Sequence, residues 1–323
     1  MSLLRPLFVC VLLTLLAFPS SAFAWLDNGH MAVACVAYEH LDKPLQARAV
    51  ALLKLNPDYK KWLAQIPSGT PANKKDEMIF MIAATWPDQI KAPDTGYTND
   101  PHSKSGDTPG PDLKVSAQNI GYSDMLYHKY WHFVDTPFST DETPLPTIPT
   151  PDAETQIAIF RSTIASDASD DLKSYDLAWL LHLVGDVHQP LHCSTRVSHT
   201  DPQGDAGGNN VKICTVSGKC GKNELHAFWD GLPGTDGKVT SAIKYGEALH
   251  AADSALSKNL DVATWVSESF NDAKEDVYIG PIKAGDGPFT ITTEYQNASE
   301  KIAQERVALA GLRLANVLKE DLK

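Results

Sequence analysis

Residues 178–193, AWLLHLVGDVHQPLHC, constrain the fold of this chain more than any other stretch. Leucine and valine recur at helical spacing before Pro190, and a residue preceding proline is disfavoured in the α region, so a buried helix that ends there is predicted. His182 and Asp186 are four residues apart and leave the same helix face one turn apart. The following turn can bring His192 to the same place, and two imidazoles with a carboxylate are ligands that zinc accepts. A helix with hydrogen-bonded core histidines is the alternative interpretation.

The amino terminus has the pattern of an export signal. Arg5 precedes an apolar run at residues 7–18, and residues 22–24 form an A-x-A cleavage site. Removal of residues 1–24 would leave residues 25–323, which we expect to form a single secreted or periplasmic domain. The apolar run is too short to span a membrane, and no other stretch reaches about 18 apolar residues, so no stable membrane association is expected.

The chain is acidic. It has 28 Lys and Arg against 40 Asp and Glu, a formal net charge of −12 that becomes −13 when Arg5 leaves with the leader. A protein that grips duplex nucleic acid through a basic face would show the opposite balance. Bound divalent cations would offset the negative charge where a phosphate docks, so the composition still allows a metal-dependent phosphodiesterase acting on single strands or small esters.

Four cysteines remain after removal of the leader. An even number in an oxidising compartment predicts two disulfides, for which three connectivities exist. Cys214 and Cys220 close a short loop, which favours them as one pair and leaves Cys35 and Cys193 as the other. A thiolate metal site is the alternative, although the sequence has no C-x-x-C spacing.

Helical patterns dominate the rest of the mature chain. The first begins where Asp27 or Asn28 can cap it, and a short aromatic run at residues 130–135 is predicted to be extended. The other helical patterns cover residues 44–55, 76–86, 152–165, 240–258, 261–277 and 292–321. Segments rich in loop-forming residues separate them at 91–121, 137–151 and 194–223. The sequence therefore predicts a mainly α fold, a single helical domain with long surface loops.

Five short motifs carry imidazoles and carboxylates in order along the mature chain. They are W-x4-H beginning at Trp25, W-x-D ending at Asp88, H-F-x-D beginning at His132, H-x3-D-x-H-Q-P-L-H beginning at His182, and L-H-x-x-W-D ending at Asp230. Each motif alone is weak. The ordered set resembles the zinc-dependent, single-strand-specific nucleases of the S1/P1 type, which are exported and mainly helical.

The resemblance implies a centre of three zinc ions. The ligands that it implies are Asp88, His132, His182 and Asp186 for one ion, the Trp25 amino and carbonyl groups with His30 and a shared Asp186 for the second, and His192, His226 and Asp230 for the third. Asp186 would bridge two ions and, with Asp88, hold the catalytic water. Zinc lowers the pKa of a bound water to about 7, so no separate general base is needed. The amino-terminal ligand requires cleavage directly before Trp25.

The resemblance also implies a nucleobase site. Residues at the positions of Phe133 and Asp135 stack on a base and hydrogen-bond it in the family, and Asn209 of the GGN turn can reach the same place. The alternatives are a core role for Phe133, a turn cap or a partner to a metal ligand for Asp135, and a left-handed turn position for Asn209. The implied enzyme hydrolyses RNA and single-stranded DNA to 5′-phosphate products, acts on nucleotides as a 3′-nucleotidase, and is expected to be a monomer.

Two other interpretations use the same ligands. Zinc-dependent phospholipases C, which act on phosphatidylcholine-like lipids, share a trinuclear centre and an amino-terminal Trp ligand. In that group the first histidine lies further from the tryptophan and the last ligand is glutamate. Here His30 follows Trp25 by five residues and the last ligand is Asp230, which favours the nuclease. An exported zinc-binding protein without hydrolytic activity is the non-enzymatic alternative.

Overall fold

The computed structural model describes residues 25–103, 106–249 and 255–322, apart from the side chains of residues 222 and 284. The predicted leader lies outside the described residues, so its cleavage stays a prediction. Within the described part of the chain, no helix combines the length and the apolar character that crossing a bilayer requires.

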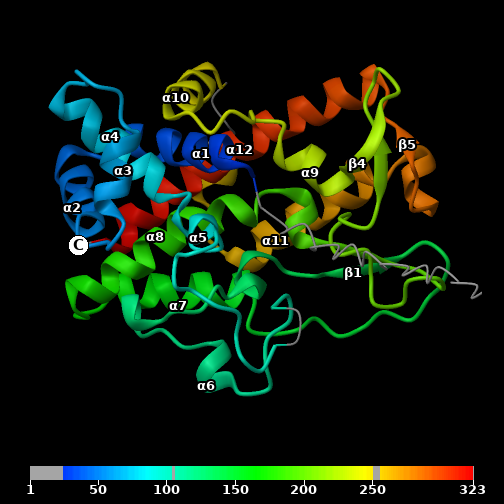
Figure 1. The fold of residues 1–323 in the computed structure, drawn as a ribbon, viewed down its shortest axis with the longest axis horizontal. Coiled ribbons are helices and arrows are strands. Elements are labelled where there is room, and N and C mark those ends of the chain that lie inside the picture. Colours follow the sequence, from blue (N-terminus) through cyan, green and yellow to red (C-terminus); the bar gives the residue numbers. More distant parts are fainter. Residues whose placement is uncertain (1–24, 104–105, 250–254, 323) are drawn as a thin grey trace, which may run out of the picture.

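The described chain is mainly α-helical, as predicted (Figure 1). Its α-helices are α1 (Asp27–Glu39), α2 (Lys43–Leu53), α3 (Tyr59–Gln65), α4 (Ala72–Ala83), α5 (Trp86–Gln89), α6 (Leu113–Ser116), α7 (Ala153–Ala165), α8 (Asp170–Asp186), α9 (Leu225–Asp230), α10 (Val239–Ala248), α11 (Val262–Asp272) and α12 (Thr293–Asp321). The shorter helical segments are η1 (Gly121–Ser123), η2 (Lys129–His132), η3 (Pro190–Cys193), η4 (Leu256–Lys258), η5 (Ala273–Val277) and η6 (Gly280–Ala284).

Short strands form two small sheets in the described residues. The strands are β1 (Pro137–Ser139), β2 (Thr195–Val197), β3 (Lys212–Cys214), β4 (Cys220–Glu224) and β5 (Phe289–Thr290). β1 and β2 pair in parallel, while β3 lies between β4, to which it is antiparallel, and β5, to which it is parallel. The segment 194–223, expected to be one long loop, therefore contains β2, β3 and most of β4.

Helix α8 lies at the centre of the helical layer (Figure 1). It is buried from Lys173 to Asp186, and a helix that is buried on all sides belongs in a core rather than on a surface. The Ser169 side chain caps its amino terminus by accepting a hydrogen bond from the Leu172 amide. Four other helices pack around α8, namely α7, α2, α12 and α1. The side chains on α8 therefore lie next to side chains from several distant segments of the chain.

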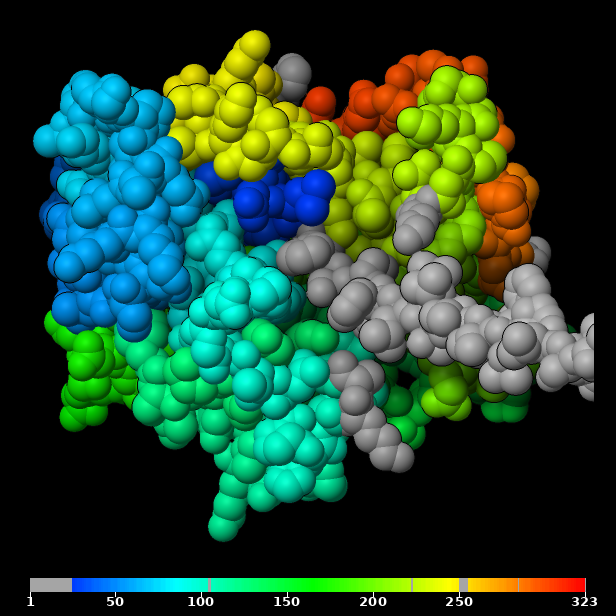
Figure 2. Space-filling view, in the orientation of Figure 1, coloured from blue at the N-terminus to red at the C-terminus, as the bar shows by residue number. Residues whose placement is uncertain are grey.

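Helix α1 packs tightly on α12, α10 and α4. A Cβ atom at Gly311 would lie 2.5 Å from the Cβ of Val36, so glycine is required where α12 crosses α1. In Figure 2 the dark blue surface near the start of α1 lies beneath the yellow surface of α10 and beside the lighter blue of the segments that follow α1. A second apolar cluster, which includes Ile213, Leu225 and Trp229, lies under the sheet that contains β3.

Two local predictions are wrong. The run at 130–135 is not extended at its start, because η2 covers Lys129–His132, and His128, which precedes η2 at φ 43°, stacks on Trp131 with ring centroids 3.6 Å apart. Neither Asp27 nor Asn28 is the N-cap of the first helix. Leu26 occupies that position, and no side chain caps α1. Asn28 instead lies within α1 and donates a 2.9 Å hydrogen bond to Asp236.

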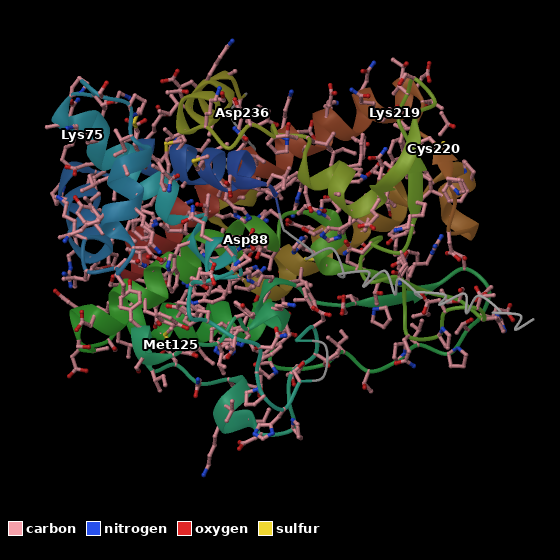
Figure 3. The ribbon with its side chains drawn as sticks, viewed as in Figure 1. Lys75, Asp88, Met125, Lys219, Cys220 and Asp236 are labelled. Atoms are coloured by element: carbon pink, nitrogen blue, oxygen red, sulfur yellow. A yellow bond between two sulfur atoms is a disulfide. The ribbon has the colours of Figure 1, made fainter. Side chains whose placement is uncertain are left out.

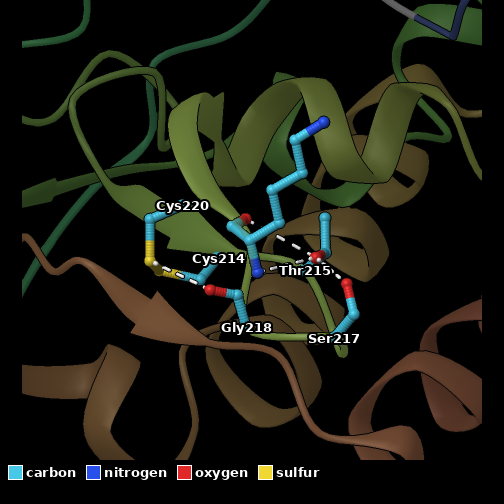
Figure 4. Close-up of a disulfide and its surroundings, with 6 residues drawn as sticks. Cys214, Thr215, Ser217, Gly218 and Cys220 are labelled. Carbon is cyan, nitrogen blue, oxygen red and sulfur yellow. Dashed lines mark hydrogen bonds between the residues drawn. A yellow bond between two sulfur atoms is a disulfide. The ribbon is translucent and has the colours of Figure 1, made fainter.

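One of the two predicted disulfides is present. Cys214 and Cys220 are bonded across the turn between β3 and β4 (Figure 4). The pairing of Cys35 with Cys193 is wrong, because both are free and buried in different surroundings. Cys35 faces α10, where a Cβ at Gly246 would lie 3.3 Å from its sulfur. Cys193 donates from its thiol to the carbonyl of Val187 at 3.4 Å.

Candidate metal centre

The structure brings the eight candidate ligand side chains of the five motifs together from separate elements. They come from α1 (His30), α5 (Asp88), η2 (His132), α8 (His182 and Asp186), η3 (His192) and α9 (His226 and Asp230). None is more than 6% exposed. Asp88 lies near the middle of the molecule (Figure 3). His30 and Asp230 are 200 positions apart in the sequence, yet the eight side chains converge in one buried region.

The first group consists of Asp88, His132, His182 and Asp186. The His182 Nε2 atom lies 2.9 Å from His132 Nδ1 and 3.3 Å from Asp186 Oδ2. His132 Nδ1 lies 3.1 Å from Asp186 Oδ2, and both imidazole nitrogens lie 3.8 Å from Asp88 Oδ1. Four ligands at the usual zinc distance form a tetrahedron with edges of about 3.3 Å. The spacing of these atoms therefore fits one tetrahedral zinc ion.

Asp186 also faces a second position. Its Oδ1 atom lies 3.4 Å from His30 Nε2, while its Oδ2 atom faces the first group. The Trp25 side chain is held beside it, because the indole Nε1 donates to the Gly185 carbonyl at 3.1 Å. A Cβ at Gly185 would lie 2.9 Å from His30 Nδ1, so glycine is needed where α8 approaches α1. The two Asp186 oxygens therefore point in directions that suit a carboxylate bridge.

The third group consists of His192, His226 and Asp230. The two imidazoles face each other through Nε2 atoms 3.0 Å apart. Asp230 Oδ2 lies 3.5 Å from His226 Nε2, and Asp230 Oδ1 lies 4.0 Å from His192 Nε2. This arrangement offers three ligand atoms, one fewer than a tetrahedral zinc ion takes.

Backbone carbonyls fix the orientation of three of the histidines. Nδ1 of His182 bonds to Ala84 O at 2.7 Å, Nδ1 of His192 to His132 O at 2.8 Å, and Nδ1 of His226 to Gly207 O at 2.7 Å. A carbonyl can only accept, so each Nδ1 carries the proton and each Nε2 presents a lone pair. This is the arrangement that protein metal sites use to orient histidine ligands.

The centre contains buried polar atoms that lack hydrogen-bond partners. They are Nδ1 and Nε2 of His30, Nε2 of His132 and Oδ1 of Asp186. Burial lowers the pKa of His30, His132 and His182 well below the usual range, so these imidazoles are neutral. Burial raises the pKa of Asp186 and Asp230 well above the usual range. Cations would satisfy Oδ1 of Asp186 and one nitrogen of His30 and would allow both carboxylates to ionise, so the residues fit a metal centre.

Lys91 is a component of the site that the sequence analysis missed. Its Nζ atom lies 2.7 Å from Asp88 Oδ1, and the two side chains are 4% and 6% exposed. Its positive charge also contributes to the lowered pKa values of His132 and His182. The only local signal was its position three residues after Asp88, just beyond a short helix, and such pairs are common on protein surfaces.

A cavity of about 410 Å³ adjoins the third group. Phe133, Asp135, Asn209 and His226 contribute to its lining, so the three residues of the expected nucleobase site line one cavity beside a candidate metal ligand. Burial, with the nearby charges of Asp205 and Asp107, raises the pKa of Asp135 to about 7. Phe133 is partly buried and also packs against the main core.

The GGN turn shapes the wall of this cavity. Gly207 and Gly208, rather than Asn209, take the left-handed conformation, so the turn role considered for Asn209 is wrong. The Asn209 side chain donates to the Ala206 carbonyl at 2.8 Å. A Cβ at Gly207 would lie 2.5 Å from the Leu191 carbonyl oxygen, so only glycine lets the turn lie close enough to hold His226.

The sequence profile of the S1/P1 Nuclease family matches residues 25–323, and the chain belongs to that family. Endonuclease 4 of Arabidopsis thaliana is 30% identical over 187 residues, which cover 50% of this chain and 58% of that protein. Nuclease S1 of Aspergillus oryzae (strain ATCC 42149 / RIB 40) is 24% identical over 326 residues, which cover 93% of this chain and 92% of that protein. The chain thus spans little more than half the length of the plant relative but most of the fungal one.

Proposed function

We propose that this protein is an exported zinc-dependent nuclease. It hydrolyses phosphodiester bonds in RNA and single-stranded DNA to 5′-phosphate products and removes phosphate from 3′-nucleotides. Membership of the S1/P1 family supports the nuclease class. The disulfide between Cys214 and Cys220 is consistent with export, because such bonds persist in oxidising compartments. Cleavage before Trp25 and action as a monomer belong to the same proposal.

The observation that carries the proposal is the position of Asp186. One of its oxygens faces His132 and His182 and the other faces His30, with the third group nearby. Two cations bridged in this way and a third beside them make the kind of centre that hydrolyses phosphate esters. We therefore propose three Zn²⁺ ions, held by the ligands that the family resemblance implies.

When bound, zinc supplies a water acidic enough to attack near neutral pH and a Lewis acid for the phosphate oxygens. The chain's own residues provide the geometry. Asp88 and Asp186 would hold the two neighbouring cations, and the hydrogen bond from His182 Nδ1 to the Ala84 carbonyl fixes the orientation of the imidazole ring. Lys91 provides a buried positive charge next to Asp88, which favours a phosphate over a neutral ester.

Phe133, Asp135 and Asn209 are proposed to hold a nucleobase in the adjoining cavity. A ring beside the phosphate site can stack on any base, and such stacking contributes about 1–3 kcal/mol. Because the pKa of Asp135 is raised to about 7, its carboxyl group is protonated at lower pH and can then donate a hydrogen bond to a base. A site that uses stacking needs unpaired bases, which accounts for the proposed preference for single strands.

The alternative function is a phospholipase C acting on phosphatidylcholine-like lipids. A carboxyl group and an amide in the cavity wall suit the edge of a base better than a quaternary ammonium, which aromatic cages bind. The zinc content of correctly processed protein, with assays on single-stranded DNA and on phosphatidylcholine with and without chelator, tests the proposal. We expect chelator-sensitive DNA cleavage. Release of diacylglycerol without DNA cleavage would reverse the assignment, and bound zinc without either activity would favour a zinc-binding protein.

A further inference from the structure

A second group of potential metal ligands lies outside the proposed catalytic centre. Cys35 and Glu39 on α1 and Glu77 on α4 each offer one ligand atom, and these atoms lie within 4.8 Å of one another. α1, α4 and α10 pack together here (Figure 1). Cys35 follows His30 by five residues, about 140° around the helix and ~7 Å along it. The group therefore faces away from the catalytic histidines.

Glu77 has a buried carboxylate oxygen that no hydrogen-bond donor in the described residues satisfies. The residue is only 4% exposed, and one carboxylate oxygen, Oε2, pairs with Lys74 at 2.7 Å. The other oxygen, Oε1, is buried without a hydrogen-bond partner. An unpaired buried carboxylate oxygen is costly, and a bound cation would remove that cost.

The electrostatics of the group also favour a cation. Burial raises the pKa of the Cys35 thiol to about 12, with smaller contributions from the carboxylates of Glu39, Glu77 and Glu247, whereas Lys74 lowers it. Without a cation the thiol therefore keeps its proton. A divalent ion would offset the two excess negative charges and favour the thiolate.

We propose that Cys35, Glu39 and Glu77 form a peripheral site for a zinc-class divalent cation, separate from the catalytic centre. Sulfur and carboxylate oxygen are both zinc ligands, and a thiolate selects zinc or cadmium over magnesium or calcium. On binding, the S–H bond of Cys35 breaks, its proton passes to solvent, and a sulfur–metal bond forms. Glu39 lies at the surface, so a cation can enter from solvent beside it.

The cation would link α1 to α4. α1 begins beside Trp25 and carries His30, and the chain leaving α4 supplies the Ala84 carbonyl that orients His182. The link therefore stabilises the two segments that support the catalytic centre without contacting it. A ligand that binds only the folded state raises the unfolding temperature, by an amount that grows with the logarithm of its concentration divided by its Kd.

Cadmium titration of the zinc-loaded full-length mature protein tests this site. The ligands proposed for the catalytic centre include no cysteine, so an ultraviolet cadmium–thiolate absorption band reports on a free thiol, either Cys35 or Cys193. We expect the band to saturate with one cadmium per protein and zinc to compete with it. Cys35→Ser should abolish the band, whereas Cys193→Ser, which alters the other free buried thiol, should keep it. No band in the parent protein, or a band that persists in Cys35→Ser, would overturn the proposal.

Two further variants distinguish the loss of a metal ligand from misfolding of the protein. Glu39→Gln alters a surface residue and should weaken cadmium binding at least tenfold while the far-ultraviolet circular dichroism stays unchanged. Glu77→Gln keeps an oxygen that can accept from Lys74 and should weaken binding similarly. Unchanged affinity in both would refute the assigned ligands. Neither variant should reduce cleavage of single-stranded DNA, so the outcome is independent of the nuclease proposal.

Discussion

Gln189 Nε2 donates a 2.7 Å hydrogen bond to Asp230 Oδ1, and both residues are buried. The Oε1 atom of the same amide accepts from the Leu191 amide at 2.6 Å, which fixes the orientation of the side chain. Oδ1 of Asp230 is thereby held by Gln189, while Oδ2 faces His226. The turn after α8 thus sets the orientation of a carboxylate on α9, and Gln189 acts as a positioning residue.

Gln189→Glu should lower the zinc affinity of the third group by about 10–100-fold. The variant keeps an acceptor for the Leu191 amide but replaces the donor to Asp230 with a second carboxylate. Zinc retained during titration with a competing chelator measures the effect. Gln46→Glu is the matched control, because Gln46 is a buried amide that donates to the Tyr38 carbonyl on α1. Equal zinc affinity in Gln189→Glu and the parent would show that the hydrogen bond has no positioning role.

One extra residue before Trp25 should remove one zinc ion and most of the nuclease activity. The proposed second site uses the free amino group and carbonyl oxygen of Trp25, and an additional peptide bond converts the amine into an amide that cannot coordinate in the same way. Metal analysis of the two forms, with rates on single-stranded DNA, checks this. If both forms bind the same zinc and cleave at the same rate, the amino-terminal ligand is wrong.

Phe133→Ala should raise KM for single-stranded oligonucleotides by roughly 5–150-fold and leave kcat nearly unchanged. The ring lines the cavity, and loss of base stacking removes binding that is equal in the ground and transition states. Steady-state kinetics measure both constants. Hydrolysis of bis(p-nitrophenyl) phosphate, a diester without a nucleobase, is the control and should not change. A similar loss on both substrates would mean that Phe133 supports the fold instead of the base.

The Asp176 carboxyl group should make stability depend on pH. It is fully buried on α8, and burial raises its pKa to about 7, although hydrogen bonds from Asn119 and Thr163 oppose the shift. Between pH 4 and 7 the folded state binds more protons than the unfolded state, so the unfolding free energy falls as pH rises. Ionisation of Asp176 should lower the unfolding free energy by on the order of 2–4 kcal/mol above pH 7, and this destabilisation should vanish below pH 4.

Asp176→Asn tests this pH dependence, because the amide does not titrate. The stability of the variant relative to the parent should improve progressively from pH 4 to pH 7 and then level off. Urea denaturation of metal-free protein at several pH values measures the difference and avoids the proton release that accompanies zinc binding. A difference that is independent of pH would show that Asp176 is ionised in the folded state throughout this range.

Local sequence spacing determined the parts of the site that lie on one element. His182 and Asp186 had to share a face of a helix, as had His226 and Asp230, because residues four apart are neighbours on any α-helix. The short loop between Cys214 and Cys220 made their pairing predictable for a similar reason. The order of the motifs also pointed to the family that the profile match establishes.

Only the tertiary structure decided which groups meet across elements. The 3.6-residue period places a side chain on a helix face but does not say which segment packs against it. Sequence therefore revealed neither the role of Lys91 beside Asp88 nor that of Gln189 beside Asp230. It also paired Cys35 with the wrong partner, because packing against α10 and α4 sets the surroundings of that thiol, and those contacts are long-range.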